Sequence, residues 1–324
     1  MNRFYCLGAV SLLLPLALGQ VGARPAKLSK QAQVPPVLKR ALEAGPKLRY
    51  IGTRVIEFRK QGQTERYSEI VTREGGFTRI EFPEGSKYQG QIIVETPRER
   101  RHFFPDKNEI RILPPRREEA LHRLARLAHS DKFVFAGGPP ASVAGVRTAQ
   151  VVVTDKAGNV MQRIFIEPKT GLLVKRQMFD MGGAPVGLYQ FSQLNMNPKI
   201  NPMIFRLDRK GARIIRPIDT LRELAKKQGF PLAALPPSSG YMLHFSNVRP
   251  IDGQNVLMSF YGADNGRLSL FVTKEPLDAA KLKNFGRGTV NVYTWREAGL
   301  SLALIGNQDQ EALRRLAGTV SFGT

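Results

Sequence analysis

The chain has 324 residues, of which 42% are hydrophobic, and 49 lysines and arginines against 27 acidic residues give a formal charge of +22. This hydrophobic content excludes a wholly disordered chain. The charge favours an anionic partner such as nucleic acid, anionic lipid, acidic polysaccharide or an acidic protein. Cys6 is the only cysteine, which excludes a disulfide within the chain and a metal site built from several cysteines.

The first 23 residues have the pattern of a signal peptide. Arg3 supplies a positive charge, and residues 7–18 form an apolar run that is too short to span a bilayer. Small residues follow, and we expect cleavage after Ala23, with a cut after Gly19 as second choice and an uncleaved anchor as the alternative. The pattern predicts an exported protein that works in an extracytoplasmic compartment, so nucleic acid is not an expected partner. An anionic lipid, an envelope surface or an acidic protein segment fits the charge better.

Short strand-like runs follow a basic, flexible lead-in at 24–36. Residues 37–44 predict a short helix. Antiparallel strands are predicted at 48–59, 63–73, 77–82, 92–95, 101–104 and 109–113, and then at 132–136, 146–154, 160–166, 172–180 and 185–195. Between the two sets, residues 116–129 carry an apolar stripe at helical spacing. The region 37–200 therefore predicts a large antiparallel sheet or barrel with helices on one face.

The strand pattern breaks at 197–217, where three prolines and six basic residues stand against one acid. This composition predicts a basic linker, which we place at 201–218. A second domain is expected at 219–324, where Asp219 is a plausible N-cap of the first helix.

The second domain is predicted to be a small α+β unit. Its strands are expected at 241–248, 256–261, 268–274, 290–296 and 300–305. A last helix is expected to start near Asn307 and to end at Gly318.

No catalytic or metal-binding motif stands out. His122 and His129 are seven residues apart on one predicted helix, whereas metal ligation from a helix usually needs a four-residue spacing. The chain has no G-x-S-x-G, no H-E-x-x-H and no glycine-rich phosphate loop. We therefore expect no enzyme activity, no metal and no cofactor.

Two sets of residues are candidate binding sites. A concave sheet face partly covered by helices can leave an apolar cavity for acyl chains, and the candidates for its lining are Ile80, Phe82, Ile92, Val94, Ile110 and Ile112. Each of them also fits an ordinary core position. The second set is a basic cluster at the domain junction, a place where partners or anions often dock: Arg206, Arg209, Lys210, Arg213 and Arg216.

Three stretches of the chain carry a resemblance to known families. The first is RIEFP at 79–83, followed by IIV at 92–94 and FFP at 103–105. The second is IEPKTGLLVKR at 166–176, followed by FD at 179–180 and LYQF at 188–191. Both resemble the LolA/LolB-like half-barrel of periplasmic lipoprotein carriers. With the third stretch, the block from Leu235 to Ala317, the chain is similar to sigma-E factor regulatory proteins of the MucB/RseB type.

The resemblance implies a mainly β (α+β) fold. Residues 37–200 would form a curved antiparallel half-barrel with helices on its concave face, and 219–324 a smaller α+β domain. The resemblance also implies a negative regulator that binds the periplasmic part of an anti-sigma factor and shields it from regulated proteolysis. An envelope lipid or lipopolysaccharide-like ligand would relieve that shielding. In the family pattern an Asp-containing pair is expected where this chain has Glu167-Pro168.

Two other functions stay open. A periplasmic lipid or lipoprotein carrier would use the same half-barrel but has no need of a second domain. An envelope hydrolase would require a site that is assembled only in three dimensions. A homo-oligomer is also compatible with the sequence.

Overall fold

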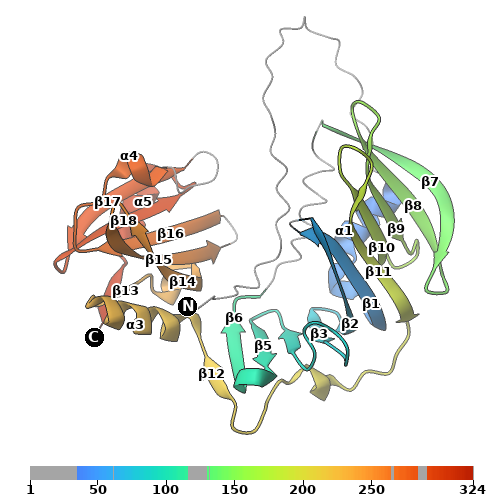
Figure 1. Cartoon of the computed structure of the whole chain (residues 1–324), viewed down its shortest axis with the longest axis horizontal. Coiled ribbons are helices and arrows are strands. Elements are labelled where there is room, and N and C mark those ends of the chain that lie inside the picture. The colour runs from blue at the N-terminus through green and yellow to red at the C-terminus, as the bar shows by residue number, and fades with distance from the viewer. Residues whose placement is uncertain are drawn as a thin grey trace, which may run out of the picture. The chain divides into compact units, whose positions relative to one another are not determined.

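The computed structural model describes residues 35–60, 62–115, 130, 132–263, 266–283 and 290–323. Twelve strands in this part of the chain form one curved sheet, here named the first sheet (Figure 1). The strands are β1 (Arg49–Lys60), β2 (Gln63–Glu74), β3 (Phe77–Glu81), β4 (Ile92–Glu95), β5 (Arg100–Phe104), β6 (Glu109–Leu113), β7 (Phe133–Val143), β8 (Val146–Asp155), β9 (Val160–Ile166), β10 (Leu173–Phe179), β11 (Pro185–Asn195) and β12 (Arg213–Ile215). The prediction of a mainly β chain with a curved antiparallel sheet is confirmed.

The strand order across the first sheet is β12-β6-β5-β4-β3-β2-β1-β11-β10-β9-β8-β7. β1 pairs with both β2 and β11 and so joins the two halves of the sheet. The neighbours are antiparallel, as expected for strands joined by short turns, except that β12 runs parallel to β6. β12 reaches β6 from the segment that follows β11, so a late part of the chain extends the edge formed by an early part.

One face of the first sheet is covered by the helix α1 (Pro36–Glu43). Proline suits the first helical position because its missing N–H would have no partner there. Leu38 and Ala41 are buried against residues of β8 and β9, among them Val151 and Ile164. Tyr50, Val71 and Phe191 belong to a neighbouring buried cluster on the same face. We name this side the helix face, and the other side the opposite face.

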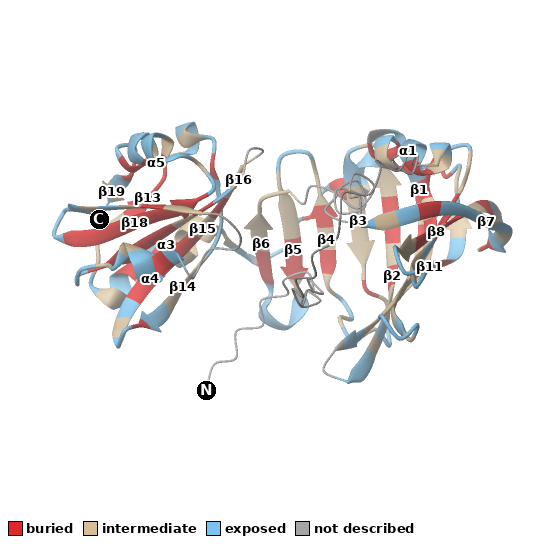
Figure 2. Cartoon of the chain, turned by 90° about the horizontal axis from the view of Figure 1, so that it is seen from above, coloured by how far each residue is buried: buried red, intermediate tan, exposed pale blue. Residues whose placement is uncertain are grey.

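The chain after β12 forms a second sheet with the order β14-β15-β16-β18-β17. Its strands are β14 (Met242–Ile251), β15 (Gln254–Ala263), β16 (Gly266–Thr273), β17 (Asn291–Glu297) and β18 (Leu300–Gly306). The helices α3 (Pro217–Gln228) and α5 (Gln310–Ala317) pack on one face, and α4 (Ala279–Leu282) packs on the other. Buried residues run along the strands of both sheets (Figure 2).

Shorter elements complete the described chain. β13 (Leu232–Ala234) pairs with β19 (Ser321–Gly323). Single 3-10 turns occur at η1 (Gly45–Lys47), η2 (Pro105–Lys107), η3 (Pro202–Phe205) and η4 (Pro237–Ser239). No helix among the described residues has the length and apolar character needed to cross a bilayer.

Some predicted boundaries are wrong. β7 continues through Pro139 and Pro140 to Val143, and its register breaks at Gly138. Proline lacks an N–H group, and an edge strand tolerates this because its outward-facing N–H groups have no partner strand to bond. Asp219 is not the N-cap of α3 but its third residue, where the carboxylate accepts a 2.9 Å hydrogen bond from the Arg216 N–H. The signal peptide, the lead-in as far as residue 34 and the predicted helix at 116–129 lie outside the described residues. The division into domains at 37–200 and 219–324 stays a prediction.

Substituting Gly171 with alanine is expected to lower the free energy of unfolding by about 2–5 kcal/mol. Gly171 has φ +76°, and an added Cβ would lie 2.8 Å from the carbonyl oxygen of Arg40 in α1. Gly158→Ala is a matched control, because Gly158 has φ +89° with nothing within 4 Å. It should cost only the backbone strain, about 1–2 kcal/mol. Equal losses for the two variants in urea unfolding would contradict this packing of α1.

Candidate functional site

Residues 200–215 are here named the strap: residues 200–212 pass along the opposite face of the first sheet, and the strap ends in the edge strand β12. Phe205 and Leu207 are 9% and 3% exposed. They pack in one buried cluster with four residues of the sheet, Ile92, Val94, Phe103 and Ile110. In an extended chain, residues two apart point to the same side, so the alternation at 205–207 places both apolar side chains against the sheet. The predicted linker is therefore attached to the first sheet over part of its length.

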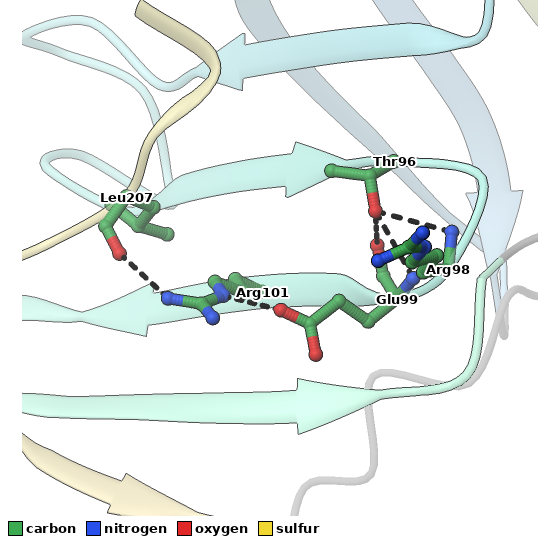
Figure 3. Close-up of polar contacts among 5 residues, drawn as sticks. All are labelled: Thr96, Arg98, Glu99, Arg101 and Leu207. Carbon is green, nitrogen blue, oxygen red and sulfur yellow. Dashed lines mark hydrogen bonds and ion pairs between the residues drawn. The ribbon is translucent and has the colours of Figure 1, made fainter. Parts of the chain in front are cut away.

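Arginines of the sheet fasten the strap through its backbone. Arg79 on β3 donates a 2.9 Å hydrogen bond to the carbonyl of Ile204. Arg101 on β5 donates to the carbonyl of Leu207 at 3.4 Å, and its Nε donates to Glu99 at 2.6 Å, which orients the guanidinium (Figure 3). Because the acceptors are main-chain oxygens, these bonds fix the path of the strap whatever its side chains are.

Glu109 anchors the end of the strap. This carboxylate is 5% exposed and accepts hydrogen bonds from Arg213 of β12 and, at 3.3 Å, from Arg111. The Arg213 backbone N–H also donates to the carbonyl of Asn108 at 2.9 Å. Burial alone would raise the pKa of Glu109, but the hydrogen bonds from Arg213 and Arg111 hold this pKa below its ordinary value. The pair therefore stays ionised at neutral pH.

The contribution of Glu109 to stability is expected to be lost in acid. Its pKa is lower in the folded than in the unfolded chain, so the contribution is complete above the ordinary value of about 4.3 and disappears as the pH falls through the folded value. Glu109→Gln should lower the free energy of unfolding by about 1–3 kcal/mol at pH 7. Urea unfolding from pH 7 to pH 3 measures the difference between the two proteins. A difference that does not shrink below pH 4 would contradict this role.

The six apolar candidates do not share one face. Ile80 pairs with Ile93, which places Ile92 and Val94 on the other side of the sheet. Ile80 packs against the helix-face cluster, whereas Ile92, Val94 and Ile110 lie under the strap. Ile112 is on the strap side by register. The prediction of a single inner face is wrong because the loop between β3 and β4 changes which alternate residues point inward.

Phe82 belongs to an aromatic group at the end of β1–β3. Its ring centroid lies 6.0 Å from that of Tyr67 and 5.4 Å from that of Tyr88, and Tyr67 lies 6.4 Å from Phe58. Tyr67 pairs with Ile56, and this pair is two residues along the strands from the helix-face pair of Arg54 and Glu69. Tyr67 therefore lies on the helix face as well. Ile80 and Phe82 are thus the two apolar candidates that remain on the helix face, and their contact with lipid stays a prediction.

The five basic candidates are all exposed, and they divide by their contacts. Arg206 and Arg209 come together with Arg79 of the sheet around a hollow of about 350 Å³, which Glu81 and Asp208 also line. Arg213 donates a hydrogen bond to the carboxylate of Glu109. Arg216 is the N-cap of α3, and its backbone N–H donates to Asp219. The structure therefore brings two of the five, Arg206 and Arg209, into one concave site. The acids in that site offset part of its charge.

A buried polar cluster on the helix face was missed by the sequence analysis. Arg54 on β1 lies opposite Glu69 on β2 and forms an ion pair with it. Arg54 also donates a 3.3 Å hydrogen bond to the hydroxyl of Tyr189. Burial alone would lower the pKa of Arg54, but the nearby Glu69 raises it above its ordinary value, while burial raises the pKa of Tyr189. The signal was a charge at an inward-facing strand position.

Potential metal ligands and His102 are the remaining chemical groups to place among the described residues. Among them, no group of three or more His, Cys, Asp or Glu is placed to hold a metal ion. His102 bonds Gln91 at 2.8 Å and lies 4.0 Å from the ring of Phe104. These contacts fit a structural histidine.

The sequence matches the profile of the MucB/RseB N-terminal domain over residues 33–207. The chain belongs to the MucB/RseB family. Comparison with curated protein sequences gave no match. Family membership confirms the resemblance noted in the sequence, and the profile covers the first sheet from α1 to the strap residue Leu207.

Solved structures of MucB are similar to the chain at low identity. A chain of the Pseudomonas aeruginosa MucA/MucB complex is 16% identical, with 89% of this chain and 98% of that chain covered and a TM-score of 0.42. A crystal structure of MucB alone is 17% identical, with 88% and 96% covered and a TM-score of 0.40. The LolA superfamily protein NE2245 from Nitrosomonas europaea is 14% identical, with 56% and 99% covered and a TM-score of 0.28.

Proposed function

We propose that this protein is a non-enzymatic periplasmic regulator that binds the periplasmic part of an anti-sigma factor. The observation that carries the proposal is the family match over residues 33–207. MucB, a namesake of the family, has been solved in complex with MucA(peri). By analogy, this chain takes a periplasmic segment of a membrane protein as its partner, shields it from regulated proteolysis and releases it when envelope lipid binds.

The distribution of charge supports an acidic partner or an anionic lipid. Residues 24–216 contain 36 lysines and arginines against 18 acids, whereas residues 217–324 contain 12 against 9. The first part therefore carries most of the excess. A charge of this size raises the rate of encounter with an anionic surface. The hollow beside Arg206 and Arg209 is our candidate for a contact with that partner.

Lipid sensing is assigned to the helix face of the first sheet. Phe58, Tyr67 and Tyr88 are only partly buried, and Phe82 joins them. Aromatic side chains that keep some exposure suit contact with an acyl chain on one side and polar head groups on the other. Lys87 lies beside this group, with its Nζ 5.8 Å from the ring of Tyr88.

The second candidate function is a lipid or lipoprotein carrier, favoured by the half-barrel alone. A shortened chain tests it only if the strap is kept. A chain that ended at residue 200 would lack Phe205 and Leu207 and so uncover Ile92, Val94 and Ile110. A variant that ends after Arg216 retains these contacts. Full activity of that variant in cells would favour the carrier, because the second sheet would then be unnecessary.

Protection from proteolysis tests the regulatory proposal. The mature chain, residues 24–324, is added to washed membranes of its own source, and the membrane anti-sigma factor is followed under the protease that starts its cleavage. The regulator should lengthen the lifetime of the uncleaved form, and vesicles of anionic envelope lipid should shorten it again. An unchanged lifetime at saturating concentrations of the chain would contradict shielding.

A further inference from the structure

A hollow of about 390 Å³ lies between β7, β8 and β9 of the first sheet. Its apolar walls include Pro139, Pro140, Val152 and Phe165, and among the described residues that line it only Arg163 is charged. The volume is at the lower end of the range for ligand pockets, roughly 300–1,000 Å³. The hollow involves none of the residues assigned to the strap or to the proposed partner contact.

The side chain of Gln150 lines the hollow. Gln150 is 9% exposed as a whole residue. The amide lies directly over Gly138, where an added Cβ would come within 2.6 Å of its Oε1. A ligand in the hollow can form hydrogen bonds with this amide, which both donates and accepts. The glycine makes the room in which the amide sits.

Two cations stand beside the hollow without a counter-ion. Phe165 pairs with Gln150 on one side and with Lys175 on the other, and Arg163 is two residues along the same strand. The Nζ of Lys175 lies 5.4 Å from the ring centroid of Phe165, and the Cζ of Arg163 lies 5.5 Å from that of Phe179. Neither cation has a carboxylate partner among the residues that the structure describes. An incoming carboxylate therefore gains charge-assisted hydrogen bonds without breaking an ion pair.

We propose that this hollow binds an acidic peptide segment, with an aspartate or glutamate between Arg163 and Lys175 and a neighbouring apolar side chain against Pro139, Pro140 and Phe165. The segment is bound through side chains rather than as an added strand. The two prolines lack the N–H groups that an added strand would need at the edge of β7. A peptide suits the hollow better than a long acyl chain does, because Gln150 and Arg163 in its lining can bond polar groups. The site is independent of the anti-sigma factor proposed above.

Nuclear magnetic resonance on the mature chain, labelled with ¹⁵N-glutamine, tests the site. The probes are the dipeptides acetyl-Phe-Glu-amide and acetyl-Phe-Gln-amide, which differ only in the carboxylate. We expect a saturable shift of the Gln150 side-chain signal with the Glu peptide, and at least about fivefold weaker binding of the Gln peptide. Arg163→Gln and Lys175→Gln should each weaken the Glu peptide by a similar factor.

The control is Arg147→Gln, an exposed arginine of β8 that does not line the hollow. It should leave the titration unchanged. All three substituted side chains are at least partly exposed, so the variants are expected to fold. Equal binding of the two peptides, or no shift of Gln150, would overturn the proposal. Tighter binding of decanoate than of the Glu peptide at the same signal would also overturn it, in favour of a lipid site.

Discussion

Glu69→Leu is expected to lower the free energy of unfolding by about 3–5 kcal/mol, measured by urea unfolding at pH 7. The carboxylate of Glu69 is the ion-pair partner of Arg54, and the two side chains are 6% and 17% exposed. Removing the carboxylate leaves the Arg54 guanidinium buried. Among the described residues, the Tyr189 hydroxyl is then the one hydrogen-bond acceptor left to it. An uncompensated buried charge is costly because the low dielectric of the interior no longer repays its desolvation.

Two further variants isolate the effect of the charge. The double variant Arg54→Met with Glu69→Leu should recover most of the loss, because no buried charge remains. Glu74 lies on β2, like Glu69, but is partly exposed, and its carboxylate is 3.2 Å from Arg49 of β1. Glu74→Leu should cost less than about 1 kcal/mol. Similar losses at Glu69 and Glu74, or a double variant as unstable as Glu69→Leu, would contradict a buried pair.

Phe205→Ala is expected to cost about 3–5 kcal/mol, because it empties the centre of the strap contact. Phe205 packs against Ile92, Val94 and Phe103, and its ring centroid is 5.7 Å from that of Phe77. Native-state hydrogen exchange follows the Arg213 amide, which bonds the carbonyl of Asn108. Faster exchange of this amide, with little change at β8 and β9, would locate the loss in the strap rather than in the whole sheet.

Met203→Ala provides the matched control for the strap. Met203 is in the same 3-10 turn as Phe205 but is 54% exposed. Its substitution should change the free energy of unfolding by less than about 0.5 kcal/mol. If Phe205→Ala cost no more than Met203→Ala, the strap would not be held by its apolar side chains.

The strands could be predicted from the sequence because the patterns that indicate a strand are local. β4, β6, β9 and β11 occur at the residues predicted for them, since each alternates or runs apolar between turn residues. The end of β7 was missed because Pro139 and Pro140 indicate a break, and only the edge position of the strand removes that conflict.

The residues that share a binding surface were harder to predict, since they depend on which strands pair and in what register. Ile80 and Ile92 both look like inward-facing strand residues, yet the pairing of Ile80 with Ile93 sends Ile92 to the opposite face. Phe205 and Leu207 alternate like strand residues inside a basic, proline-containing segment, and nothing local shows which sheet they meet. Arg206 and Arg209 were found from charge density, but the part played by Arg79 required the fold.

Capture from membranes tests the central claim, that this chain binds an anti-sigma factor, most directly. The tagged mature chain, residues 24–324, is crosslinked in washed membranes of its own source, and the recovered proteins are identified by mass spectrometry with and without anionic envelope lipid. The account predicts recovery of a membrane-spanning anti-sigma factor, and less of it when the lipid is present. Recovery of lipid or lipoproteins with no such factor, at equal crosslinking efficiency, would contradict the regulator and leave the carrier in its place.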